Sequence, residues 1–368
     1  MDNENDAIVV KKKRIYYLDF IKSISIILVI FVHYPWISSS PASNISMCLT
    51  IIAVPLFFMV NGALMFSKEL DIKKHINKTI VILISCATWK ILILSICLIA
   101  KKVSINNYNL IDILLYCLTS KNLNGVPAEH LWFLYALIKI YIIFPFVYIA
   151  MQKNRKYLIW ILIYCIIFSF GIDFLNNMSK YLNTTFGIIK VNFNVFKDTY
   201  NIIGNNTQYL TFFIFGFLLH NKFYNTKLSV KDSILIFFGI VFGFCFIIFT
   251  RYIQTGNFVT GKYIRIDNDY GNIGNLTLCI SLFIFFSKVT FKNRLFNKCI
   301  NFIGSRTINI YYIHMLVLLF ISNIHKYFIR FNGAKLNFAR TIIVLIICIA
   351  ITEFMKLIKT VKKILNLY

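Results

Sequence analysis

The sequence predicts an all-α, polytopic integral membrane protein with about ten transmembrane helices and with both termini in the cytoplasm. Of its 368 residues, 58% are hydrophobic and only 14% are charged. A soluble domain usually has about 45–50% apolar and about 25% charged residues, so this chain has too few charges to cover a soluble surface. The apolar run 80–100 also reaches the roughly 20 residues that a membrane-crossing helix needs.

Ten apolar segments separated by polar loops are the predicted spans. They cover residues 17–37, 45–66, 79–100, 130–151, 157–175, 207–220, 232–250, 274–290, 308–327 and 338–358. The sixth is short and is also compatible with a re-entrant segment. The polar residues 1–13 are expected to form a disordered cytoplasmic tail, and 14–368 a single transmembrane domain. The first apolar run has no small-residue cleavage site, so we expect it to remain as a span.

The net charge of +25 comes from 39 Lys and Arg against 14 Asp and Glu. Cations in short loops favour the cytoplasmic side of a membrane, and most of them fall there when the N-terminus is placed inside. They are spread over many loops without a nucleic-acid-binding fold, so nucleic acid is not an expected partner. The long loops 101–129, 176–206 and 251–273 then face outward, where acceptor recognition is most easily built.

The nine cysteines contain no C-x-x-C pair, and most of them lie in apolar runs. They are expected to be buried as small hydrophobic side chains. The sequence therefore predicts neither a disulfide framework nor a metal site.

The first span contains Lys22, then ten residues, then His33. Helical rise separates the two by roughly 16 Å, which places Lys22 near the cytoplasmic face and His33 in the outer half. Ionisable residues inside a span are functional candidates by default. A hydrogen-bonded packing role explains His33 equally well, and Lys22 is close enough to the helix end to reach the headgroups.

Lys90 and Lys139 each fall about halfway along a predicted span. A charge at that depth costs at least ~2.5 kcal/mol, and the sequence offers no carboxylate at the same level. We therefore expect both lysines to line a hydrated passage that holds an anionic substrate. The alternatives are that both lysines are neutral or that the span boundaries are wrong by several residues.

Five segments, in order along the chain, resemble acyltransferase family 3 and its surface-polysaccharide O-acyltransferase branch. They are Tyr17–His33, Val54–Gly62, His130–Pro145, Thr211–Leu219 and Tyr311–His314. The chain departs from the family pattern at Lys22, where Arg is commoner, and at Asn61, where Ser is usual. The acidic pair of one large branch falls on Leu137 and Ile138, so no carboxylate role is transferred to these positions.

The resemblance implies a ten-helix enzyme of the cell membrane, with a bacterial source favoured by the Asn, Ile, Lys and Tyr bias. The implied reaction transfers an acyl group, usually acetyl, from cytoplasmic acyl-CoA to a hydroxyl of a cell-envelope glycan. His33 is then the expected general base, because an imidazole suits proton transfer at neutral pH, and Lys22 keeps the positive charge of the motif. The lipid bilayer, acyl-CoA and the glycan are the implied partners, and no oligomeric state is indicated.

The same resemblance suggests binding roles for further residues. The region of Glu129, His130 and Trp132 is a candidate acceptor site, although Trp132 also suits an interfacial anchor. The cations expected to hold the CoA phosphates are Arg14, Lys73, Lys74 and Lys78. A loop charge that sets the orientation of the protein in the membrane explains them equally well. His314 is predicted about 10 Å from the cytoplasmic face, too far from His33 for contact, with a role in donor binding or a structural hydrogen bond.

Two rival classes remain from the sequence. A transporter or flippase of glycan or lipid intermediates would also use intramembrane Lys and His, but no inverted repeat or matched pair of interrupted helices is visible. A non-catalytic scaffold leaves His33 and the two mid-span lysines unexplained.

Overall fold

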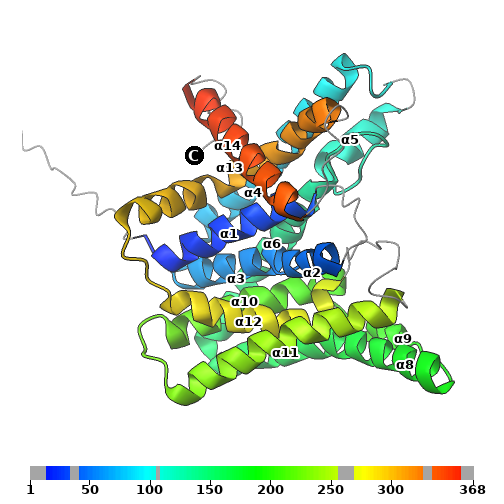
Figure 1. The fold of residues 1–368 in the computed structure, drawn as a ribbon, viewed down its shortest axis with the longest axis vertical. Helices are drawn as coiled ribbons and strands as arrows, with labels where there is room; N and C mark the ends of the chain where they lie inside the picture. Colours follow the sequence, from blue (N-terminus) through cyan, green and yellow to red (C-terminus); the bar gives the residue numbers. More distant parts are fainter. Residues whose placement is uncertain (1–13, 34–40, 105–107, 256–268, 326–333, 358–368) are drawn as a thin grey trace, which may run out of the picture.

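The computed structural model describes residues 14–33, 41–104, 108–255, 269–325 and 334–357, and these residues contain helices and no strands. The described residues form a bundle of long helices (Figure 1). In chain order the elements are α1 (Tyr16–Val32), α2 (Pro41–Thr50), α3 (Ala53–Phe66), α4 (Ile72–Ile99), α5 (Leu110–Leu118), η2 (Glu129–Leu131), α6 (Trp132–Lys153), α7 (Arg155–Ile166), η3 (Ile167–Gly171), α8 (Ile172–Phe186), α9 (Asn194–Tyr200), η4 (Gly204–Asn206), α10 (Thr207–Phe223), α11 (Val230–Thr255), η5 (Asp269–Gly271), α12 (Ile273–Lys288), α13 (Arg294–His325) and α14 (Ala334–Leu357).

Seven helical segments of the described chain are long and apolar enough to cross a membrane. They are Cys48–Phe66, Ile72–Ile99, Glu129–Lys153, Arg155–Phe186, Val230–Thr250, Arg294–Ile321 and Asn337–Leu357. The other three predicted spans fall on α1, α10 and α12, which have 17, 17 and 16 residues. The chain is thus a helical membrane protein, and the count of ten and the cytoplasmic location of both termini remain predictions.

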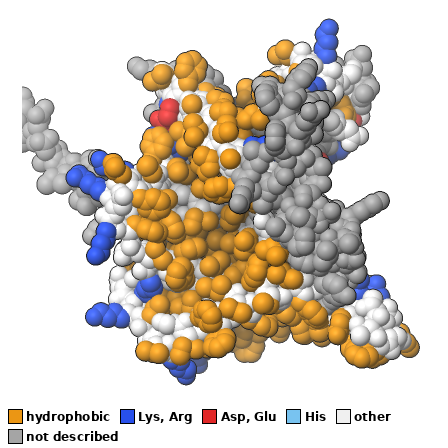
Figure 2. Space-filling view, viewed as in Figure 1, with side chains coloured by type: hydrophobic (Ala, Val, Ile, Leu, Met, Phe, Trp, Pro, Cys, Tyr) orange, Lys and Arg blue, Asp and Glu red, His pale blue; other side chains and the backbone are white. Residues whose placement is uncertain are grey.

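The surface distribution of side chains fits a lipid environment. Figure 2 shows apolar side chains over the broad middle of one face, whereas most of the visible Lys and Arg gather along the edge where α1, α11 and α13 begin. Exposed apolar side chains such as Phe237, Phe238 and Phe242 lie on the outer face of α11. Such a surface would be unfavourable in water and is favourable against lipid.

Helices α3 and α10 make the closest crossing at the centre of the bundle. A side chain at Gly62 would overlap the backbone of Phe213, and one at Gly216 would overlap the backbone of Met59. Small residues allow this approach, which is typical of helix contacts in membranes. The sixth predicted span, α10, is therefore buried in the centre, with Phe212, Phe213 and Ile214 fully enclosed.

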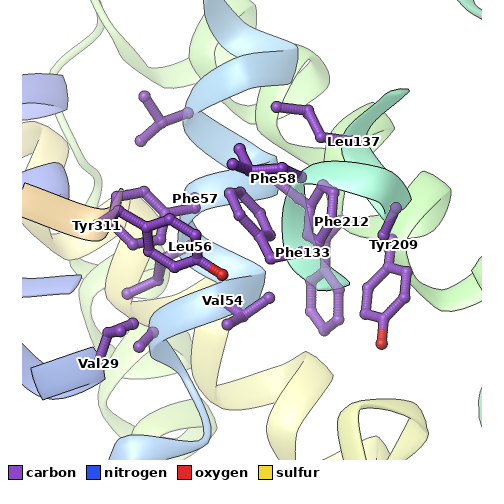
Figure 3. Packing of buried hydrophobic residues seen from close by; sticks show 14 of the residues in the cluster. Val29, Val54, Leu56, Phe57, Phe58, Phe133, Leu137, Tyr209, Phe212 and Tyr311 are labelled. Atoms are coloured by element: carbon purple, nitrogen blue, oxygen red, sulfur yellow. The ribbon is translucent and has the colours of Figure 1, made fainter. Parts of the chain in front are cut away.

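Aromatic side chains fill the space around this crossing. Figure 3 shows Phe57 and Phe58 of α3 beside Phe133 of α6 and Tyr311 of α13. The rings of Phe58 and Phe133 meet edge to face at 4.9 Å, and Phe58 stacks on Tyr209 at 4.8 Å. This core fixes α6 and α13 against α3, and both helices carry candidate site residues.

Helices α1 and α13 cross near their first turns. Ser23 Oγ donates to the Ile300 carbonyl (3.0 Å), and Gly304 leaves room for the backbone of Asp19. His33 and His314 each lie ten residues beyond Ser23 and Gly304, respectively. Both histidines are therefore roughly 15 Å further along their helices, at similar depth.

Candidate active site

Three histidines from different parts of the chain meet at one end of the bundle. His33 follows the last residue of α1, His130 lies in η2 and His314 in α13. The ring centroids of His33 and His314 are 5.3 Å apart, and those of His130 and His314 are 4.9 Å apart. We call His33, His130 and His314 the histidine cluster.

The prediction that His314 lies too far from His33 for contact is wrong. It measured depth from residue 308, where the apolar run begins, but α13 begins at Arg294 and is 32 residues long. His314 is therefore 20 residues into its helix, about 30 Å from the start rather than about 10 Å. Polar residues in the first turns of α13 hide this extension from a hydropathy pattern.

The three imidazoles differ in burial, and this difference limits the role that each of them can take. His33 is half-buried, whereas His130 is 2% exposed and His314 is fully buried. Nδ1 of His314 lies 2.7 Å from the Tyr311 carbonyl, which can only accept, so Nδ1 carries the proton. In a neutral ring this leaves Nε2 as the basic nitrogen, and Nε2 has no hydrogen-bond partner among the described residues.

Tyr311 connects the histidine cluster to a large cavity. Its hydroxyl donates to the His130 carbonyl, and its ring lies 5.5 Å from those of both His130 and His314. Tyr311 also lines a cavity of about 470 Å³, which we call the first cavity. Sequence reasoning assigned no role to Tyr311, although its position three residues before His314 places both on one helix face.

The first cavity runs between α1, α3, α4, α6 and α13. Its walls are mainly apolar, and its polar side chains are Lys22, Asn61, Asn77, Lys78, Ser85, Tyr141, Ser305, Thr307, Tyr311 and Tyr312. Lys22 and Lys78 thus line the same mainly apolar cavity as Tyr311, which contacts the histidine cluster.

The two lysines of the first cavity are held by different partners. Lys22 pairs with Asp19 at 2.5 Å, and Arg14 pairs with the other carboxylate oxygen at 2.8 Å. Lys78 donates to the Tyr141 hydroxyl (3.1 Å), which donates to Asn61 Oδ1 (3.1 Å). Asn61, the residue that departs from the family pattern, is therefore part of the cavity wall.

The remaining predicted phosphate-binding residues, Arg14, Lys73 and Lys74, do not line the first cavity. Lys73 and Lys74 are exposed, and Lys74 pairs with Asp71 at 2.8 Å. The hydrogen bond from Lys74 holds the pKa of the Asp71 carboxyl below its ordinary value. Glu129, predicted to bind the acceptor, is exposed at the start of η2 and does not line the first cavity.

A second cavity of about 380 Å³ lies on another face of α6. Its lining is polar and aromatic: Ser120, Trp132, Tyr135, Ala136, Lys139, Asp173, Lys197, Asn206, Gln208 and Tyr209. Trp132 and Lys139, both predicted to bind substrate, share this cavity. Trp132 follows His130 by two residues, so the second cavity reaches the end of α6 at which the histidine cluster lies.

The prediction that Lys90 lines a hydrated passage is wrong. It is 1% exposed, and its ammonium donates to the carbonyls of Tyr116 (2.8 Å), Thr119 (2.7 Å) and Lys121 (2.9 Å). The rings of Tyr116 and Tyr135 lie 4.6 and 5.0 Å from the same atom. The charge is therefore satisfied by the carbonyl end of α5, where the helix dipole favours a cation.

Within the described parts of the chain, no group of three His, Cys, Asp or Glu side chains could hold a metal ion. A family model described as an acyltransferase domain matches residues 15–353, which is nearly the whole chain. Neither the curated proteins nor the solved structures gave a match.

Proposed function

Because this membrane protein belongs to acyltransferase family 3, we propose that it transfers an acyl group from acyl-CoA to a hydroxyl of a cell-envelope glycan. The acyl group is proposed to be acetyl and the membrane to be the bacterial cell membrane. Membership of the family makes the chain an acyltransferase. The geometry of the two cavities and the histidine cluster supports the proposed donor and acceptor, whereas acetyl is proposed from the family resemblance alone.

The observation that carries the proposal is the position of Tyr311. It lines the first cavity and touches two members of the histidine cluster. The apolar first cavity suits the pantetheine arm of a CoA thioester, and Lys22 and Lys78 suit its phosphates. A thioester that enters beside these lysines would then meet imidazoles at the other end.

His33 is the proposed general base because it alone in the cluster is more than slightly exposed. It removes the proton from the acceptor hydroxyl as the oxygen attacks the thioester carbonyl carbon. The tetrahedral intermediate collapses with cleavage of the C–S bond, and the thiolate of CoA leaves and takes up a proton. His314, with its proton fixed on Nδ1, is proposed as a positioning residue whose ring packs against that of His33.

The test uses purified full-length protein in lipid nanodiscs with radiolabelled acetyl-CoA and envelope glycan from the source cells. The wild type is expected to release CoA thiol and to label the glycan. His33→Ala is expected to lower this rate by about 10²–10⁴-fold, the usual contribution of general base catalysis. His314→Gln should change the pH dependence of the rate as well as its size, because a purely structural residue would not alter proton transfer.

Two control measurements test whether the His33→Ala variant is still folded. Thermal unfolding and gel filtration must show that His33→Ala folds as the wild type does. A wild-type rate in a folded His33→Ala variant would rule out the base role. Movement of a glycan intermediate across the membrane without thioester cleavage would instead identify a transporter or flippase.

A further inference from the structure

Helix α6 forms the wall between the two cavities. Trp132, Tyr135 and Lys139 line the second cavity, whereas Leu134 and Tyr141 line the first. The members of each set are three, four or seven residues apart, so each set occupies its own stripe of the helix. A molecule in the second cavity is therefore separated from one in the first by the thickness of a single helix.

The lining of the second cavity combines stacking surfaces with hydrogen-bonding groups. Trp132 and Tyr209 have ring centroids 5.6 Å apart, and Ser120, Asn206 and Gln208 add hydroxyl and amide groups. A sugar ring presents an apolar face that packs on aromatic rings and a rim of hydroxyls that need polar partners. The lining has both features, whereas the first cavity is mainly apolar.

The second cavity also carries an excess positive charge. Lys197 pairs with Asp173 at 3.2 Å, which balances one of its two lysines. Lys139 is exposed, and the structure gives it no hydrogen bond or ion pair with any described residue. An ammonium within a membrane-crossing helix requires water or an anion to offset its desolvation.

We propose that the second cavity binds the acceptor as an anionic sugar unit, with the Lys139 ammonium holding its carboxylate or phosphate and Trp132 packing on its ring. The assignment rests on the proposed acyl transfer and makes Lys139 the residue that selects a charged acceptor. Trp132 lies two residues after His130, so a sugar seated on it is at the end of α6 nearest the histidine cluster.

The test measures sugar binding without turnover. Quenching of tryptophan fluorescence is followed in nanodiscs with methyl glucuronide, with uncharged methyl glucoside, and with glycerol 3-phosphate as an analogue of a lipid headgroup. The glucuronide is expected to bind about tenfold more tightly than the glucoside, the lower range for a hydrogen bond to a charged group. Trp132→Phe should remove the quenching.

Two charge variants act in opposite directions. Lys139→Gln is expected to abolish the preference for glucuronide and leave glucoside binding unchanged, whereas the exposed Lys102→Gln serves as a matched control outside both cavities. Asp173→Asn removes the one carboxylate among the described lining residues and is expected to tighten glucuronide binding severalfold. This second variant keeps the test decisive if Lys139→Gln does not fold.

Equal binding of glucuronide and glucoside would overturn the proposal, as would a glucuronide preference that survives Lys139→Gln. Binding of glycerol 3-phosphate as tight as that of glucuronide would also overturn it, because the cavity would then recognise charge without a sugar ring. Release of CoA thiol from acetyl-CoA is measured separately. A protein that cleaves the thioester but binds no charged sugar keeps its proposed function and loses only this acceptor assignment.

Discussion

Replacement of Lys90 by Met is expected to loosen α5 and the loop after it while leaving the bundle folded. The ammonium of Lys90 donates to three carbonyls at the end of α5, and methionine fills a similar volume without a donor. The Tyr116 carbonyl is buried, so leaving it without a partner costs about 1–3 kcal/mol. The Thr119 and Lys121 carbonyls are partly exposed and can exchange the ammonium for water, at about 0.5–1.5 kcal/mol each.

The loss of about 2–6 kcal/mol acts on a local opening rather than on global unfolding, because α5 lies outside the seven long apolar helices. Hydrogen exchange of residues 110–121 measures this opening directly. Since about 1.4 kcal/mol corresponds to a factor of ten, amide exchange should accelerate by about thirtyfold or more. Exchange in α3 and α10 should stay unchanged.

Lys102→Met is the matched control, because Lys102 is an exposed lysine in the connection between α4 and α5, away from the three carbonyls that Lys90 contacts. If residues 110–121 exchange equally in Lys90→Met and Lys102→Met, the three carbonyl contacts do not stabilise α5. The two variants should also differ in sugar binding. Ser120 lies between Thr119 and Lys121 and lines the second cavity, so loosening this loop should weaken both methyl glucuronide and methyl glucoside.

Two further predictions follow from the cavities and the helix crossing. Lys78→Gln should raise the KM for acyl-CoA about two- to fivefold, as expected for one partly solvated charge contact. Lys73→Gln and Lys74→Gln alter residues outside the first cavity and should leave the KM unchanged. Equal effects of all three variants in steady-state kinetics would contradict donor binding in the first cavity. Gly62→Ala should destabilise the α3–α10 crossing by about 1–3 kcal/mol, measured by thermal unfolding. Gly171→Ala should have little effect, because a side chain at this position meets only one atom, at 3.6 Å. Similar unfolding of the two variants would refute the close approach of α3 and α10.

Hydropathy located the helices well because the apolar character of a span is a local property of the sequence. Each of the ten predicted ranges overlaps a helix, but the pattern could not find where α13 begins. Residues 294–307 include Asn297, Asn301 and Arg306, which interrupt an apolar run without interrupting the helix. That error displaced His314 by about 20 Å along the helix axis and separated it from His33.

Lys90 and Lys139 show why the site could be predicted only in part. The sequence presents them alike, as lysines near the middle of apolar segments, and the energetic requirement that each charge be compensated applies to both. Lys90 meets this requirement with backbone carbonyls, which every residue carries and which therefore leave no signature in a sequence. Lys139 meets no such group among the described residues and lies in a cavity with a stacking surface and amides. Lys90 thus holds a loop that lines the second cavity. Lys139 is the cation in that cavity that we propose binds a charged ligand.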